Sequence, residues 1–181
     1  DRSVVRKAME RTLEWAGRSK QARHNLHQAL FGIIQGGHFD DLRKESLERT
    51  ANMPFDGYAL GGLSVGEPIE LMYEMVEKFA PLMPFDKPRY LMGVGMPLDI
   101  LKAVSCGIDM FDCVIPTRYG RNGCAITHTG QLVVRNGVYS DDPRPLDEKC
   151  ACKVCARFSR AYIRHLLNSE EILGPRLVPS S

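Results

Sequence analysis

The stretch that decides the fold is "RYLMGVGMPLDILKAVSCGIDMFDCVI", residues 89–115. An apolar run at 89–92 is followed by a glycine-rich break, a helix-like segment at 97–105 and a second apolar run at 109–115. Strand, break, helix and strand form the repeating unit of a parallel sheet that is covered by helices. The stretch therefore predicts an α/β fold.

The same unit recurs toward the amino end of the chain. The predicted helices cover residues 4–16, 39–51, 68–83 and 97–105, and the predicted strands cover residues 30–34, 57–60, 89–92 and 109–115. A closed barrel of this type has eight strands in about 250 residues. Four strands in a chain of 181 residues leave two interpretations, a small open sheet or the second half of a barrel.

Composition narrows the class of protein and the compartment. Apolar residues make up 44% of the chain and charged residues 25%, and the net charge is +2. No apolar run approaches the roughly 20 residues of a membrane helix, and residues 1–12 lack the apolar core of a signal peptide. We expect a cytoplasmic protein without membrane contact, in which any binding of nucleic acid depends on local basic patches.

Cysteines cluster near the carboxyl end, after a predicted hairpin at 123–137 and a polar linker at 140–149. Cys150, Cys152 and Cys155 have the spacing C-x-C-x2-C, and a basic predicted helix follows at 156–173. With no secretory signal, such clustering favours a metal site over disulfides. A structural Zn²⁺ needs four sulfur or nitrogen ligands, and water, His165 or another chain are the open alternatives for the fourth.

Two aspartates in the last predicted strand raise the question of a reactive carboxylate, because burying one is costly unless it is paired. Side chains alternate along a strand, so Asp109 and Asp112 should point to opposite faces, with Met110 and Val114 beside Asp112. Asp112 lies nearer the carboxyl end, where parallel α/β folds place ligands. For Asp109 we predict a structural role, such as binding nearby backbone amides.

Five motifs, in this order, resemble the bacterial tRNA-guanine transglycosylases. They are "IIQGG", "YALGGLSVGE", "KPRYLMGVG", "DMFDCVIPTR" and the cluster "CACKVC" followed by "SRAYIRHL", and the resemblance runs from about Phe31 to Leu177. The resemblance implies the second half of a TIM (β/α)8 barrel over residues 1–138. It also implies an inserted zinc-binding subdomain over residues 139–181, either whole or truncated.

The resemblance further implies a pentosyltransferase of queuosine biosynthesis. Such an enzyme exchanges the wobble guanine of a U-G-U anticodon for 7-aminomethyl-7-deazaguanine. Its nucleophile matches Asp112, which would form a covalent aspartyl-ribose intermediate. The matching base-binding residues are Gln35, Gly61, Gly62, Leu63, Val65 and Met92, and those for tRNA are Thr117, Arg118 and Arg121 in a tRNA-facing loop. Val65 fits the bacterial preference for the aminomethyl base over queuine, and arginine suits contacts to base edges or phosphates.

Two parts of the family pattern lie outside this match. The family's general acid/base aspartate belongs to a "DSGGFQ"-like segment that the chain does not contain, and the zinc histidine would fall on Ser181. We therefore expect the piece to be inactive alone and the parent enzyme to be a homodimer. An open half-barrel should self-associate or pair with the missing half. The alternatives are a non-catalytic, zinc-bearing tRNA-binding fragment or accessory subunit, against which Asp112 argues, and an unrelated α/β protein with a zinc knuckle.

Overall fold

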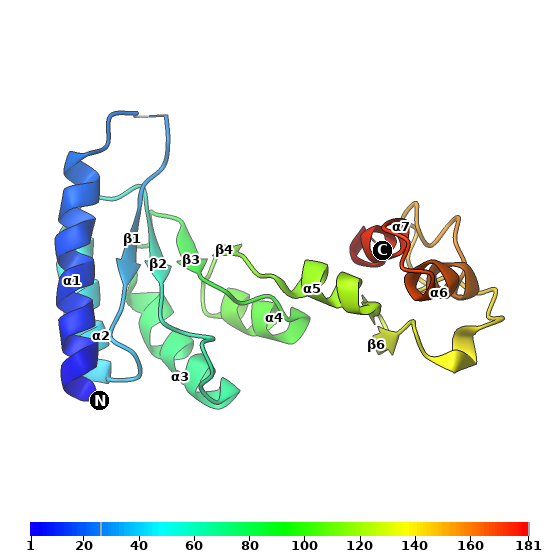
Figure 1. Ribbon diagram of the computed structural model, residues 1–181. Coiled ribbons are helices and arrows are strands. Elements are labelled where there is room, and N and C mark those ends of the chain that lie inside the picture. The colour runs from blue at the N-terminus through cyan, green and yellow to red at the C-terminus, as the bar shows by residue number, and fades with distance from the viewer. Residues whose placement is uncertain (26, 181) are drawn as a thin grey trace. The chain divides into compact units, whose positions relative to one another are not determined.

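The computed structural model describes residues 1–25 and 27–180 and divides the chain into two compact units, Asp1–Cys113 and Val114–Ser181 (Figure 1). The predicted limits of a barrel part at 1–138 and a zinc-binding part at 139–181 stay a prediction.

The first unit alternates helices with short strands, as predicted. Its elements are α1 (Arg2–Gln21), β1 (Phe31–Ile34), α2 (Asp40–Ala51), β2 (Gly57–Leu60), α3 (Ile69–Phe79), the 3-10 turn η1 (Ala80–Leu82), β3 (Arg89–Leu91), α4 (Pro97–Ser105) and β4 (Met110–Phe111). The strands form one parallel sheet in the order β1-β2-β3-β4, which Figure 1 shows side by side. The predicted α/β class with a parallel sheet is confirmed.

The core of this unit lies between the sheet and the helices that follow its strands. Ile34, Leu60 and Leu91 are almost completely buried, and each ends its strand. In α3 the buried positions Met72, Met75, Val76 and Phe79 repeat at helical spacing, so that one apolar stripe of the helix faces the core. This packing joins α3 to the sheet. Because the strands are parallel, their carboxyl ends lie at one edge.

The last predicted strand was too long. The structure has only Met110–Phe111 as β4, and α5 (Ile115–Asn122) begins where the sequence predicted further strand. Pro116 lies in the first turn of α5, where its fixed backbone angle suits a helix start. Val114 is the N-cap residue of this helix and is exposed. The prediction that Val114 and Asp112 lie on the same face of one strand was therefore wrong.

The second unit combines a hairpin with short helices. After α5 come β5 (Cys124–Thr127), β6 (Gly130–Val133), η2 (Gly137–Tyr139), α6 (Arg160–Asn168), α7 (Leu173–Leu177) and η3 (Val178–Ser180). The predicted antiparallel hairpin is confirmed. The predicted helix at 156–173 was too long at both ends. Helix α6 begins after Ser159, whose side chain caps it by accepting a hydrogen bond from Tyr162 N, and it ends at Asn168. None of the described helices has the length and apolar character that crossing a membrane requires.

Candidate active site

Strand register brings the predicted site residues of the first unit into one row. Ile34 pairs with Leu60, Leu60 with Leu91, and Leu91 with Phe111. The residues that come next along each strand are Gln35, Gly61, Met92 and Asp112. All four therefore emerge at the carboxyl edge of the parallel sheet, where α/β folds bind ligands.

Asp112 is held at this edge by two donors from β3 and the residues after it. Its Oδ1 atom accepts hydrogen bonds from the Tyr90 hydroxyl at 2.5 Å and from Gly93 N at 2.9 Å. The Tyr90 hydroxyl and then Gly93 N lower the pKa of the Asp112 carboxyl, while the carboxylate raises the pKa of Tyr90 to about 12. Asp112 is exposed, contrary to the buried carboxylate expected from its apolar neighbours. Near neutral pH it is an ionised carboxylate with one oxygen fixed.

Asp109 has the structural role that the sequence predicted. Its Oδ2 atom accepts a hydrogen bond from Arg89 N at 2.9 Å, and Asp109 N donates to Arg89 O at 2.8 Å. These bonds tie the start of β4 to the start of β3, at the edge opposite Asp112. The geometry thus separates the two aspartates, since one holds the sheet together and the other presents an oxygen atom at the ligand edge.

Gln35 lies against a stretch of backbone that has no side chains. A Cβ atom added to Gly62, which has a φ of 66°, would lie 2.5 Å from Gln35 Oε1, and one added to Gly61 would lie 3.0 Å from Gln35 Nε2. Glycine at both positions therefore lets the amide of Gln35 approach the peptide groups after β2. An amide and a row of peptide groups together offer the donors and acceptors that recognise the edge of a planar base.

A cavity of about 190 Å³ lies beside this contact. It is lined by Gly37, His38, Gly62, Leu63, Val65, Glu67 and Leu71. Three of the predicted base-binding residues, Gly62, Leu63 and Val65, are therefore in its wall. Gln35, Gly61, Met92 and Asp112 belong to the same edge of the sheet but do not line this cavity.

Glu67 is a residue that the sequence analysis did not single out. Its carboxylate accepts hydrogen bonds from Ser64 N and, at 2.9 Å, from Val65 N, and Ser64 has a φ of 60°. Burial raises the pKa of Glu67, but the backbone N–H groups of Glu67, Val65 and Ser64 lower it by more. Glu67 thus fixes the loop after β2. The Ser-x-x-Glu spacing of "SVGE", which is that of a capping box, is the signal that could have found it.

The predicted tRNA-binding residues lie together on helix α5 of the second unit. Thr117, Arg118 and Arg121 are exposed there, and the two arginines are three positions apart, on one face of the helix. The tRNA-facing loop expected at this point is therefore a helix. Thr117 and Arg121 also line an open cavity of about 510 Å³ beside α7.

The three clustered cysteines converge as the spacing predicted. Their Sγ atoms all lie within 4.8 Å of one another, and no further histidine, cysteine or carboxylate of the described residues joins them. Cys155 N lowers the pKa of Cys152, whereas burial raises the pKa of Cys155 to about 11. A bound cation would favour the thiolate that burial opposes, so this donor set fits Zn²⁺. His165 is not part of the group, and the family's histidine position, Ser181, lies outside the described residues.

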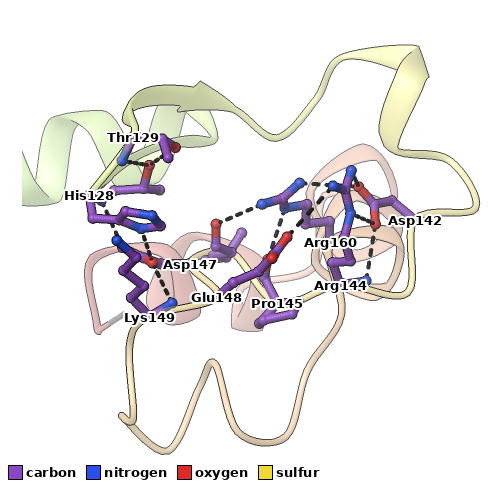
Figure 2. A network of polar contacts seen from close by, with 11 residues as sticks. His128, Thr129, Asp142, Arg144, Pro145, Asp147, Glu148, Lys149 and Arg160 are labelled. Carbon is purple, nitrogen blue, oxygen red and sulfur yellow. Dashed lines mark hydrogen bonds and ion pairs between the residues drawn. The ribbon is translucent and has the colours of Figure 1, made fainter.

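The linker before the cysteines is an ordered loop (Figure 2). The Asp147 carboxylate accepts hydrogen bonds from His128 N at 2.8 Å and Lys149 N at 2.9 Å, and Asp147 O accepts one from Cys150 N. Asp142, whose carboxyl pKa is lowered chiefly by Arg144, also contacts Arg160 at the start of α6. The loop that carries Cys150 is thus anchored to the hairpin at one point and to α6 at another.

Comparisons with known proteins agree with these features. The model of the family described as "Queuine tRNA-ribosyltransferase" matches residues 1–180. The queuine tRNA-ribosyltransferase of Desulforamulus reducens is 57% identical over 170 residues, which cover 94% of this chain and 46% of the relative. That of Caldanaerobacter subterraneus subsp. tengcongensis is 54% identical over 178 residues, which cover 98% of this chain and 48% of the relative. The chain spans about half the length of the curated relatives it matches.

The resemblance drawn from the motifs is confirmed by these matches. The family model covers the sheet with Gln35 and Asp112, the helix with Arg118 and the cysteine cluster in one continuous match. The motif residues lie together at the carboxyl edge of the sheet, and the similarity extends along the whole match. The chain therefore belongs to the queuine tRNA-ribosyltransferase family.

Proposed function

We propose that the chain is the carboxyl-terminal half of a tRNA-guanine transglycosylase that exchanges the anticodon wobble guanine for 7-aminomethyl-7-deazaguanine in queuosine biosynthesis. One observation carries the proposal. The register of the sheet places an ionised carboxylate, Asp112, in the same row as Gln35, Gly61 and Met92. A nucleophile and a base-reading edge are two of the parts that such an exchange needs.

In the proposed reaction, a carboxylate oxygen of Asp112 attacks C1′ of the ribose while the bond from C1′ to guanine breaks. Guanine leaves with the bonding electrons and takes up a proton from a general acid, which the resemblance places in a segment outside this chain. The incoming base then gives its ring N–H proton to the conjugate base of that general acid and attacks C1′, and Asp112 leaves as a carboxylate. Each step forms one bond and breaks one, as in retaining glycosyl transfer.

The base would bind beside the Gln35 amide and the peptide groups of Gly61, Gly62 and Leu63. Gly62 and Leu63 line the cavity next to Val65, a side chain that is 81% exposed. A valine at this position leaves less room than a glycine would, which supports the small aminomethyl base over the bulkier queuine.

The second unit would bind the tRNA. Arg118 and Arg121 on one face of α5 suit contacts to phosphates or to the bases of a U-G-U anticodon, and Thr117 adds a hydroxyl. Cys150, Cys152 and Cys155 would hold a Zn²⁺ ion, which supplies a structural cross-link when bound. A homodimer of the full-length enzyme completes the proposal.

The test replaces Asp112 in the full-length enzyme by asparagine and measures both incorporation of labelled guanine into tRNA and a covalent enzyme–tRNA adduct on denaturing gels. Loss of a nucleophile typically lowers kcat by about four orders of magnitude or more. Asp109→Asn is the matched control, because Asp109 lies in the same segment but binds Arg89 N. It should keep both the adduct and the exchange.

An adduct at wild-type level in Asp112→Asn would refute the assignment of the nucleophile. A wild-type protein that binds tRNA and zinc but forms no adduct and exchanges no guanine would instead be the non-catalytic tRNA-binding protein. The 181-residue chain alone should show no exchange, since the general acid is expected outside it.

A further inference from the structure

Helix α2 carries a fully buried arginine next to the candidate site. Arg43 is 0% exposed, and no carboxylate of the described residues lies within ion-pair distance of it. Burial lowers the pKa of Arg43 to about 10. A charged side chain is rarely buried without a partner, so the contacts that compensate Arg43 show what holds it there.

Those contacts are backbone carbonyl groups at the ends of two neighbouring strands. Arg43 Nε and Nη2 donate to Gly37 O at 2.9 and 2.6 Å, and both Nη atoms donate to Gly61 O at 3.3 Å. Nη1 also lies 3.5 Å from Ile34 O. The planar fork of donors in a guanidinium group is what allows one side chain to hold both carbonyls.

Helix α2 presses closely on the same turn at two more points. Gly36 has a φ of 135°, and a Cβ atom there would lie 2.6 Å from Arg43 N. Ser46 Oγ, which belongs to a fully buried residue one helical turn after Arg43, accepts a hydrogen bond from Gln35 N at 3.0 Å. The turn after β1 is therefore fixed to α2 through its backbone, and Arg43 extends that support to the end of β2.

Peptide geometry links these carbonyls to the cavity. In a trans peptide the C=O of one residue and the N–H of the next point in opposite directions. The carbonyls of Gly37 and Gly61 face Arg43, so the N–H groups of His38 and Gly62 point away from it. His38 and Gly62 both line the cavity of about 190 Å³. Neither N–H group donates a hydrogen bond to a described residue.

We propose that Arg43 is a positioning residue for recognition of the base. By holding the carbonyls of Gly37 and Gly61, it directs the N–H groups of His38 and Gly62 toward one acceptor, the ring carbonyl oxygen of a guanine-like base. This inference rests on the proposed function and extends it, since it assigns the rigidity of the base site to a residue that touches no substrate.

The test compares Arg43→Lys with Arg49→Lys in the full-length enzyme. Lysine keeps the charge but lacks the planar fork, and Arg49 is an exposed arginine on the same helix that pairs with Glu10 and Glu45. For Arg43→Lys we expect the KM for guanine to rise about tenfold, equivalent to about 1.4 kcal/mol, with the KM for tRNA unchanged. Arg49→Lys should match the wild type.

A second ligand separates positioning from general stability. 2-Aminopurine lacks the ring carbonyl oxygen, so its affinity, measured by calorimetry, should be the same in wild type and Arg43→Lys, while guanine loses affinity. If Arg43 only stabilised the fold, the variant would lower the melting temperature and the maximal rate and leave the KM for guanine and the ratio of the two affinities unchanged. That result would overturn the inference.

A measurement on the wild-type protein keeps the inference testable if Arg43→Lys does not fold. Guanine binding should protect the amide protons of His38 and Gly62 from hydrogen exchange, and failure to protect either would contradict the proposed geometry. The proposed function fails separately. A wild-type protein that binds guanine and protects these amides but exchanges no guanine into tRNA would retain the positioning role and lose the transglycosylase activity.

Discussion

Replacement of Tyr90 by phenylalanine is the sharpest test of how the carboxylate of Asp112 is supported. The change removes one hydroxyl group and keeps the aromatic ring, which contacts Phe31 edge-on. Asp112 Oδ1 then loses the 2.5 Å hydrogen bond from Tyr90 but keeps the 2.9 Å bond from Gly93 N. The carboxylate stays at the edge of the sheet with one support in place of two.

The magnitude follows from the exposure of the pair. A hydrogen bond to a charged group is worth about 1.5–3 kcal/mol when it is well shielded. Asp112 is exposed, so water replaces part of the lost bond and we expect a loss of about 1 kcal/mol, or about fivefold in the rate of adduct formation. The loss should appear in kcat, because Tyr90 does not line the cavity proposed to bind the base.

The assay is the single-turnover rate of adduct formation by the full-length enzyme. Tyr73→Phe is a matched control, since the Tyr73 hydroxyl donates to the Asp99 carboxylate at 2.6 Å, and this pair joins α3 to α4. Tyr73→Phe should lower stability slightly and leave the adduct rate unchanged. Equal adduct rates in Tyr90→Phe and wild type would refute the idea that Tyr90 orients the nucleophile.

The pH dependence has a definite sign. Tyr90 and Gly93 N lower the pKa of Asp112 in the folded state, so the group stabilises the fold above its unfolded pKa of about 3.9, and this contribution is lost as the pH falls through the lower folded pKa. Tyr90→Phe raises that folded pKa toward its ordinary value. The acid limb of the rate profile should therefore move to higher pH, and the stability difference from wild type should vanish in acid.

Two further predictions concern the base site and the metal site. Gly62→Ala adds a Cβ atom 2.5 Å from Gln35 Oε1 and should raise the KM for guanine about tenfold or more. The control is Gly66→Ala, because Gly66 also has a positive φ but has open space around it. Equal KM values in the two variants would show that contact with Gln35 is not responsible. Cys152→Ser should reduce bound zinc from about one ion per chain to a small fraction and lower the melting temperature, as measured by elemental analysis and calorimetry. Cys106→Ser, outside the cluster, should change neither, and zinc retained in Cys152→Ser would contradict the ligand assignment.

Hydrophobic pattern was sufficient to predict the sheet and the edge at which the site lies. The prediction of strand at 57–60 and helix at 97–105 matched β2 and α4 in full. Both segments have apolar runs of distinct period, bounded by glycine or proline, and such signals are local. Because the strands are parallel, predicting the ends of β1 and β2 also predicted that Gln35 and Gly61 would meet at one edge. Asp112 joins them because β4 ends at Phe111 and not at the predicted residue 115.

Hydrophobic pattern gave a wrong prediction at residues 109–115, where the same apolar residues suit either a strand or the start of a helix. Residues 109–115 are apolar enough for a strand, but Pro116 sits two residues after Val114 and suits the first turn of a helix. Val114 and Ile115 have a high strand propensity, and the prediction followed that propensity and not the helix-start signal of the proline. This helix carries Arg118 and Arg121. The sequence therefore predicted these side chains on a loop, whereas the structure has them on one face of α5.

Arg43 shows a different limit of sequence analysis. Hydrophobic spacing in α2 indicated a core face with Leu42 and Leu47, and both are buried. It gave no reason to bury Arg43 or Ser46, which are 0% exposed. Their partners are backbone groups at the ends of β1 and β2, and no side-chain pattern reports which carbonyl or amide lacks a partner until the turn geometry is known.

The hydrogen bonds that hold the candidate site come from two separate sets of residues. Tyr90 and Gly93, from β3 and its loop, hold the carboxylate of Asp112. Helix α2 holds the turn after β1 and the end of β2 through Arg43 and Ser46. No residue of one set is bonded to the other in the described chain. In the proposed reaction, bond making at the ribose and recognition of the base would therefore have separate anchors. On this reading, kcat depends on the β3 side of the row and the KM for the base on the α2 side.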